Sequence, residues 1–292
     1  MAVVINRFNR IINLKIHTLS GVPVLIKCPL RGRKPSIEIN GSFTTQSYIP
    51  AFNVTIKNLY LDMQGEQYTK LEVEAGYEGN TKVFEGNIIS MYQESPGPEG
   101  KTVIQCVEGE AKSWLDVTVS LNYEGGTFLT DVLNAIQSKL GITTLRLGKK
   151  AGELQLKEPF MYDGTARGAL VKLMKVFEEE KLALGVVENS LRAACLTFGD
   201  FIEPKILEYM SAPPQENTGD EAGAYYTTIT APWMPELKIY DKLTIPSRVY
   251  IRNFGTVGGE AKKQNIQVTG VQFHIGTTGG TNSMTVQGFL VR

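Results

Sequence analysis

Alternation of apolar and polar residues over short segments constrains the fold of this chain more than any other feature. Residues 52–57 (FNVTIK) and 70–75 (KLEVEA) place an apolar side chain at every second position. A period of two puts those side chains on one face of a β-strand and the polar ones on the other. Residues 78–80 (EGN) and 95–100 (SPGPEG) interrupt the pattern with residues typical of turns. We therefore expect residues 1–111 to form antiparallel strands joined by short turns.

The middle of the chain is predicted to hold two amphipathic helices, over residues 126–142 and 163–181. Their apolar residues recur three or four positions apart, which places them on one helix face. They are Leu129, Val132, Leu133, Ile136 and Leu140 in the first helix and Ala166, Leu170, Leu173 and Phe177 in the second. We expect Thr127 to be the N-cap and Gly141 the stop of the first helix, and Thr165 or Asp163 to cap the second. Both stripes are typical of core-facing helices.

The order of these patterns predicts an α+β, mainly β fold in three parts. A first strand domain covers 1–111, two small α+β units cover about 112–150 and 151–200, and a second strand domain covers 201–292. Within the second unit, residues 182–199 read as a hairpin that turns at 188–190. Residues 212–224 are rich in Pro, Gly and acidic residues, and we interpret them as a flexible excursion or linker.

Composition excludes several classes of protein. Thirty basic residues balance thirty acidic ones, which argues against a protein whose main task is to coat nucleic acid. Cys28, Cys106 and Cys195 lie far apart, so we expect buried small hydrophobic residues in a reducing compartment. The N-terminal segment lacks the pattern of a signal peptide, and no apolar run is long enough for a membrane span. We expect folding in the cytoplasm.

Patterns of catalytic, cofactor-binding or metal-binding residues are not found, so we predict no enzyme and no cofactor. His17 and His274 each lie inside a strand pattern, and residues 276–281 (GTTGGT) lack the helix and lysine of a phosphate-binding loop. We interpret 276–281 as a hairpin turn. Four carboxylates near expected element boundaries are assigned to capping or turns: Asp116, Asp131, Asp163 and Asp241.

A basic loop at residues 27–35 (KCPLRGRKP) is the one candidate contact site. It carries Lys27, Arg31, Arg33 and Lys34. Three interpretations stay open: contact with phosphates, contact with an acidic neighbouring subunit, or exposure to water. No aromatic residues alternate with these cations, which argues against a stacking platform for single-stranded nucleic acid.

Four motifs, taken in order, give the chain a family resemblance. They are residues 52–92 (FNVTIKNL, KLEVEAGYEG and KVFEGNIISMY), 125–142, 163–191, and the closing segments 235–247 (PELKIYDKLTIPS) and 265–289. This order resembles the baseplate hub proteins of phage tails. That family includes the late-control protein D group of contractile-tailed phages and the N-terminal hub part of type VI secretion VgrG proteins. One departure is Ile239-Tyr240-Asp241, where the family has Pro-Gly-Asp.

The resemblance implies a structural virion protein of a contractile injection system. Two tail-tube-like β-barrel or sandwich domains would flank the small α+β units, and three chains would form a pseudo-sixfold ring. Such a hub adapts a six-fold tail tube to a three-fold central spike and continues the DNA channel. The implied partners are two further copies of the chain, the tube protein, other baseplate proteins and a separate spike protein, with DNA only as passing cargo. Assembly would take place in the host cytoplasm, and the basic loop would contact a subunit or the tube.

Two other classes of function stay open from the sequence. A tube or distal-tail protein would need one strand domain, whereas this chain has two predicted ones. A carbohydrate-binding or adhesive module would need a cluster of exposed aromatic residues, whereas Trp114 and Trp233 lie far apart in the sequence.

Overall fold

The computed structural model of the chain describes residues 10–28, 36–44, 51–59, 61, 67–77, 80–94, 100–108, 117–187, 189–196, 199–207, 209–210, 215–217, 226–245, 250–251, 264–277 and 282–291. The first part holds β1 (Arg10–Thr18), β2 (Val24–Cys28), β3 (Ser36–Thr44), β4 (Ala51–Lys57), β5 (Tyr68–Tyr77), β6 (Asn80–Glu94) and β7 (Lys101–Glu108). The middle holds β8 (Thr118–Tyr123), α2 (Leu129–Leu140), β9 (Thr144–Leu147), α3 (Lys149–Glu153), β10 (Phe160–Thr165), α4 (Ala166–Val176), β11 (Leu182–Val187) and β12 (Ser190–Cys195). The closing part holds β13 (Pro204–Ile206), β14 (Tyr209–Met210), β15 (Gln215–Asn217), β16 (Tyr226–Pro232), β17 (Lys242–Ile245), β18 (Tyr250–Ile251), β19 (Gln264–Gly276) and β20 (Ser283–Val291). The predicted mainly β class is confirmed.

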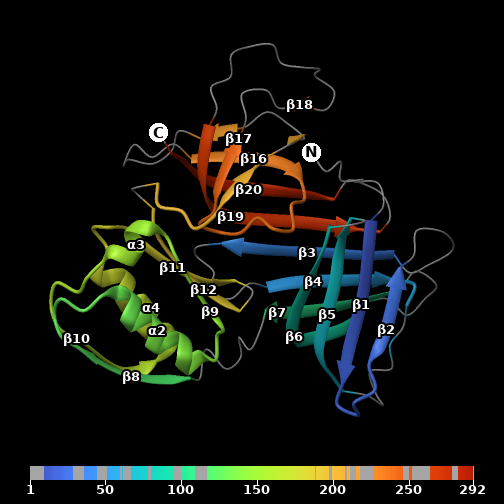
Figure 1. Ribbon diagram of the computed structural model, residues 1–292. Coiled ribbons are helices and arrows are strands. Elements are labelled where there is room, and N and C mark those ends of the chain that lie inside the picture. The colour runs from blue at the N-terminus through green and yellow to red at the C-terminus, as the bar shows by residue number, and fades with distance from the viewer. Residues whose placement is uncertain are drawn as a thin grey trace.

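Strands from both ends of the chain share one large sheet. Over the described residues it has 13 strands in the main order β15-β16-β20-β19-β3-β4-β7-β6-β5-β1-β2, with β17 paired to β19 and β13 to β17. The first and closing parts meet where β3 and β19 pair antiparallel, from Thr44 opposite Gly270 to Glu38 opposite Gly276. Figure 1 shows these two strands, blue and red, side by side in the centre of the molecule. We call the β3–β19 boundary the seam.

The alternation predicted for the first part places the same residues in the core. In β4, Phe52, Val54 and Ile56 are buried while their neighbours are exposed or half-buried. In β5, Leu71 and Val73 are completely buried. The period of two therefore identified the inward face of these strands correctly. The strands on either side of the hairpin turn predicted at 276–281, β19 and β20, pair antiparallel, while residues 278–281 themselves lie outside the described residues.

A cluster of aromatic rings holds the two sides of the seam together. The Phe273 ring of β19 lies 5.3 Å from that of Phe84 and 5.5 Å from that of Phe43, measured between centroids, and Phe84 also stacks on Trp233 at 5.7 Å. Phe84 and Phe43 come from the first part, whereas Trp233 and Phe273 come from the closing part. Gly41 of β3 faces the Phe273 ring, and a Cβ at this position would overlap the ring. Glycine at 41 is therefore what lets the ring pack across the seam.

The first predicted helix forms as α2, with all five residues of its stripe buried. Gly141 ends the helix in a left-handed conformation with φ of 69°, as predicted. The N-cap prediction was wrong by one residue. Phe128 occupies the N-cap position, while the Thr127 hydroxyl donates a hydrogen bond to the Glu124 carbonyl. Thr127 thus stabilises the turn before the helix, and Phe128 makes no side-chain cap.

The second predicted helix forms as α4, and Thr165 is its N-cap, accepting a hydrogen bond from the Gly168 amide. Phe177, the last residue of the predicted stripe, is buried just beyond the helix end. The hairpin predicted over 182–199 is confirmed, since β11 and β12 pair antiparallel with Val187 opposite Ser190. Asn189, in the turn, adopts a φ of 54°, a conformation that Asn tolerates well.

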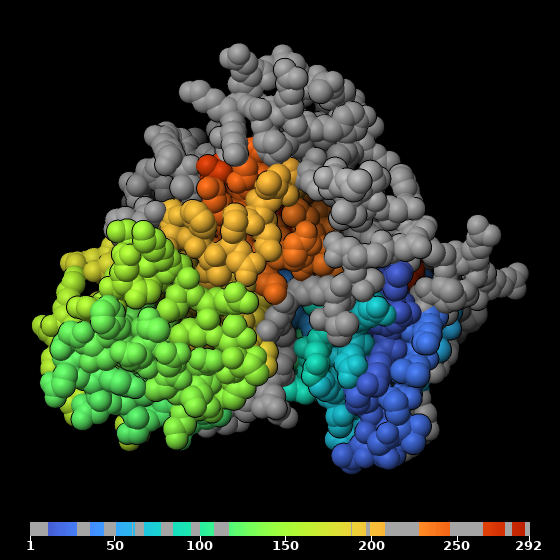
Figure 2. Space-filling view, viewed as in Figure 1, coloured from blue at the N-terminus to red at the C-terminus, as the bar shows by residue number. Residues whose placement is uncertain are grey.

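The middle part packs around a second apolar core of its own. This core draws on β8, on both long helices and on β10 to β12. Figure 2 shows this part as a rounded green lobe against the orange closing strands. β11 and β12 are buried at every position, because Ala183, Val187 and Ala194 pack into the main core while Leu184, Leu191 and Ala193 pack into the second. The predicted domain limits themselves stay predictions.

Both cysteines whose side chains the structure describes are buried, and burial raises the pKa of Cys106 and of Cys195 to about 12. The carboxylate of Asp200 adds to the effect at Cys195. The thiolate is the reactive form, and at pH 8 about one thiol in ten thousand would be ionised at such a pKa. We expect neither cysteine to be alkylated by iodoacetamide at pH 8 in the native protein, and both to react in denaturant. Peptide mass mapping after each treatment measures this, and rapid native labelling of either residue would contradict it.

Candidate assembly surface

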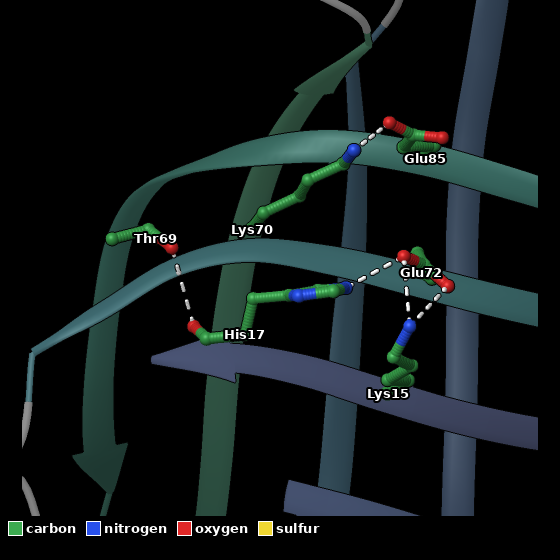
Figure 3. A network of polar contacts seen from close by, with 6 residues as sticks. All are labelled: Lys15, His17, Thr69, Lys70, Glu72 and Glu85. Atoms are coloured by element: carbon green, nitrogen blue, oxygen red, sulfur yellow. Dashed lines mark hydrogen bonds and ion pairs between the residues drawn. The ribbon is translucent and has the colours of Figure 1, made fainter. Parts of the chain in front are cut away.

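The outer face of the large sheet is formed by side chains that point away from the core. Around β1 and β5 this face carries charged side chains that pair with one another. The carboxylate of Glu72 accepts from the Lys15 ammonium at 3.3 Å and lies 2.6 Å from Nε2 of His17, and Lys70 pairs with Glu85 (Figure 3). Partial burial opposes ionisation of Glu72, yet hydrogen bonds from His17 and Lys15 lower its pKa. The charges on this region therefore largely cancel.

The edge of the sheet lies at β2, where the candidate basic loop begins. Lys27 is exposed on this edge strand. Arg31, Arg33 and Lys34 lie outside the described residues. Of the four cations in the basic loop, the structure therefore places only Lys27. The β1–β2 hairpin also exposes three apolar side chains, Leu19, Val22 and Leu25.

A buried polar cluster lies where the middle lobe meets the closing strands. Arg192 of β12 donates to Asp241 at 2.5 Å, and both side chains are almost completely buried. Removal from water raises the pKa of Asp241 and lowers that of Arg192, while the attraction between them opposes both shifts. Asp241 also accepts from the Lys238 amide at 3.1 Å. The turn role predicted for Asp241 is therefore present, but its partner Arg192 was not predicted.

Asp200 stabilises the same junction through hydrogen bonds, most of them from backbone amides to its carboxylate. Its carboxylate accepts from the amides of Lys150 and Ala151 in α3, at 3.0 and 2.9 Å, and from that of Cys195. The side-chain amide of Gln267 in β19 donates to the Asp200 carbonyl. One buried residue thus ties α3, β12 and β19 together. Sequence reasoning missed Asp200 and Gln267, because nothing in their local patterns marks them as buried.

Tyr240 stands where the family pattern has glycine, and its backbone adopts a conformation typical of glycine. Tyr240 has a φ of 67°, a left-handed conformation that favours Gly. Its side chain is completely buried, its amide donates to the Val268 carbonyl at 2.7 Å, and its carbonyl accepts from the Ile202 amide. Burial of the large Tyr240 side chain offsets the strain of this backbone conformation.

The two histidines make hydrogen bonds within the large sheet. His17 bonds to Glu72, and Nδ1 of His274 lies 2.7 Å from the Asn40 side chain across the seam. Asp131 lies in the first turn of α2, and Asp163 is exposed on β10, while Asp116 lies outside the described residues. Within the described ranges, no group of three His, Cys, Asp or Glu residues is placed to hold a metal ion. Nor does any described helix have the length and apolarity to cross a membrane.

Comparison with solved structures reveals full-length similarity to tail proteins. No protein-family model and no curated protein matches the sequence. A tail protein from Neisseria meningitidis MC58 matches with a TM-score of 0.58 and 10% identity over 97% of this chain and 96% of that one. The 43 kDa tail protein of prophage MuSo2 from Shewanella oneidensis matches with a TM-score of 0.56 and 10% identity over 97% of both chains.

A third solved structure connects the fold to type VI secretion. The E. coli c3393 protein, a component of that system described as similar to the phage T4 tail proteins gp27 and gp5, matches with a TM-score of 0.59 and 9% identity. The match covers 96% of this chain and 77% of that one. At these identities the likeness concerns the fold. The resemblance derived from the sequence is confirmed at that level: this chain has the fold of tail proteins, one of them from a prophage, and of a type VI secretion component.

Proposed function

We propose that this chain is a structural component of a phage tail or a related injection system, and specifically a baseplate hub. The observation that carries the proposal is the match over nearly the whole length of this chain and of two tail proteins. A match of whole chains supports the same general architecture. The proposed role is structural and not enzymatic.

The seam supports the hub role in particular. Strands of the first and closing parts lie side by side in one sheet, so that one chain presents two adjacent strand-rich parts. Three such chains around an axis would present six of them and match a six-fold tube on one side and a three-fold spike on the other. The proposed partners are two further copies of the chain, the tube protein, the spike and other baseplate proteins, with DNA passing through the centre.

The one tryptophan that the structure describes gives no support to an adhesive module. Trp233 is buried in the seam, where it cannot stack on a sugar, and Trp114 lies outside the described residues. A tube or distal-tail protein would share the tail location, and the stoichiometry of the assembly separates it from a hub.

The proposal is tested by the mass of the purified chain in solution, alone and mixed with the spike and tube proteins of the same tail. We expect a species of three chains, each of 32.2 kDa, and a three-fold ring with a central opening in negative-stain images. A chain that stays monomeric with both partners present would overturn the hub proposal.

The basic loop is proposed as a contact within this assembly. Replacing Arg31 and Arg33 with alanine is expected to weaken assembly, because cations that meet an acidic neighbour speed and orient the encounter. The matched control is the double change of Lys149 and Lys150, two exposed lysines of the middle lobe, to alanine. The fraction of assembled rings at increasing salt measures both. Normal assembly of the Arg31 and Arg33 variant would reject the contact.

A further inference from the structure

The exposed face of α4 is basic, and the residues that form it include no carboxylate. They line an open hollow of about 400 Å³, which consists of Thr165, Gly168 and Val171 together with the cations Arg167, Lys172 and Lys175. The whole segment 164–177 contains no Asp or Glu. We call this surface the α4 hollow.

The lobe holds one of these cations in place without neutralising it. The Lys172 ammonium donates to the Met161 carbonyl at 2.7 Å and lies 5.3 Å from the centre of the Phe160 ring. A carbonyl and an aromatic face attract a cation but carry no net charge. Over the part of the chain that the structure describes, neither Lys172 nor Lys175 forms an ion pair. The α4 hollow therefore keeps a net positive charge.

The floor of the α4 hollow is partly apolar. Val171 is half-buried there, and the methylene stems of Lys172 and Lys175 add to the apolar surface. An acidic peptide suits such a surface, because its carboxylates meet the cations while its backbone and small side chains cover the floor. The phosphates of a nucleic acid would use the cations alone.

The chain itself contains a segment of the opposite charge. Residues 206–237 include no Lys or Arg, and their carboxylates are Glu208, Glu216, Asp220, Glu221 and Glu236. Glu236 is exposed, and Glu216 belongs to β15, which ends the main order of the large sheet over the described residues. Glu208, Asp220 and Glu221 lie outside those residues. We call residues 206–237 the acidic stretch.

The α4 hollow and the acidic stretch belong to different parts of the chain. α4 packs mainly against β8, β10 and β11 of the middle lobe, whereas β15 pairs with β16 in the closing part. Figure 1 shows α4 in the green lobe and β16 well apart from it, in the orange part of the molecule. A second copy of the chain can bring the two surfaces together.

A closed ring of three chains requires a contact of this kind. Around a three-fold axis each contact joins two different surfaces, one from each neighbour. Opposite charges on the two surfaces speed the encounter and fix its register. Because the chain as a whole has no net charge, the separation of its charges makes these two surfaces complementary without making copies repel one another overall.

The two surfaces also match in length. Arg167 and Lys175 lie in the first and last turns of α4, about 12 Å apart along the helix axis. Glu216 and Asp220 are four positions apart in the sequence, and an extended chain covers about 13 Å over that separation. One pass of the acidic stretch along α4 can therefore bring a carboxylate to each end of the hollow.

We propose that the α4 hollow of each chain binds the acidic stretch of a neighbouring copy in the assembled ring. This inference rests on the proposed hub function and names one contact between copies. Arg167 and Lys175 pair with carboxylates of the neighbour, while Lys172, held by its own lobe, adds positive charge between them.

Exchanging the charges of the two surfaces tests this contact. One variant carries Arg167→Glu and Lys175→Glu, a second carries Glu216→Lys and Asp220→Lys, and a third carries all four changes. Lys172 is left unchanged, because its bond to Met161 belongs to the lobe. Analytical ultracentrifugation of the full chain at low salt measures the concentration at which half of the protein is in rings.

We expect this concentration to rise about tenfold or more in each two-residue variant, because like charges then meet across the contact. The variant with all four changes should assemble within about threefold of the wild type, since every contact then joins opposite charges again. The matched control is Lys139→Glu with Lys149→Glu, two exposed lysines of the same lobe outside the hollow, which should assemble like the wild type.

Three results would overturn the inference and leave the hub intact. The first is normal assembly of the Arg167→Glu, Lys175→Glu variant. The second is a variant with all four changes that assembles no better than those with two. The third is a reversed α4 that forms normal rings but no longer binds the tube or spike protein, which would give the hollow another partner. A wild-type chain that forms no ring would overturn the hub as well, and the solution mass distinguishes these cases.

A milder variant covers the case in which the reversed helix is unstable. Glutamate near the start of α4 is favourable and near its end unfavourable, so urea titration first checks that the reversed variant folds. Arg167→Gln with Lys175→Gln removes the attraction without adding acid, and it should raise the half-assembly concentration about threefold. Assembly of a folded Arg167→Gln, Lys175→Gln protein at the wild-type concentration would also contradict the contact.

Discussion

Replacing Phe273 with alanine is expected to lower the free energy of unfolding by about 3–5 kcal/mol, the usual cost of removing a buried aromatic ring. The ring is 4% exposed and lies within 5.5 Å of both Phe43 and Phe84, between centroids, and 6.0 Å from Trp233. Alanine leaves a cavity between the two sides of the seam that neither strand can close without breaking its pairing. Urea titration followed by circular dichroism measures the loss.

The control for this prediction is the preceding residue on the same strand. Gln272 is exposed on the outer face, so Gln272→Ala should change stability by less than about 0.5 kcal/mol. If both substitutions cost the same, the aromatic cluster does not hold the seam. The Phe273→Ala protein should also form fewer rings than the Gln272→Ala protein, because the seam positions the two halves that each chain contributes.

Local patterns of the sequence predicted the faces of strands and helices, because burial follows a fixed period within each element. The same reasoning located Gly141 and gave Thr165 as one of two candidates for the second N-cap, and both roles depend on a single turn of backbone. It misplaced the first N-cap by one residue, since a threonine beside a helix start can serve the preceding turn equally well.

Local sequence patterns do not indicate which distant segments pair with one another. Alternation in β3 and β19 shows which side chains point inward, but it does not say that Asn40 lies opposite His274. Partner choice depends on the complete sheet and on contacts such as that of Gly41 with the Phe273 ring.

The buried ion pair gives the second large effect. Asp241→Asn is expected to cost about 3–5 kcal/mol, because it leaves the charge of Arg192 in the interior without a partner. The amide still offers an oxygen to the Lys238 amide, so the loss reports the missing charge and not the turn. The same change in an exposed pair, Glu94→Gln opposite Lys101, should cost less than about 1 kcal/mol. Urea titration of the two variants gives the comparison.

A double variant separates the net contribution of the ion pair to stability from the cost of removing only one of its partners. The pKa shifts of Asp241 and Arg192 are both caused mainly by removal from water, so the pair itself gains little over a neutral replacement. Arg192→Met combined with Asp241→Asn should therefore recover more than half of the stability that Asp241→Asn alone loses. A double variant as unstable as the single one would show that the guanidinium is needed for its shape or for other contacts. Recovery would mean that charge compensation is what keeps these two residues together where the middle lobe meets the closing strands.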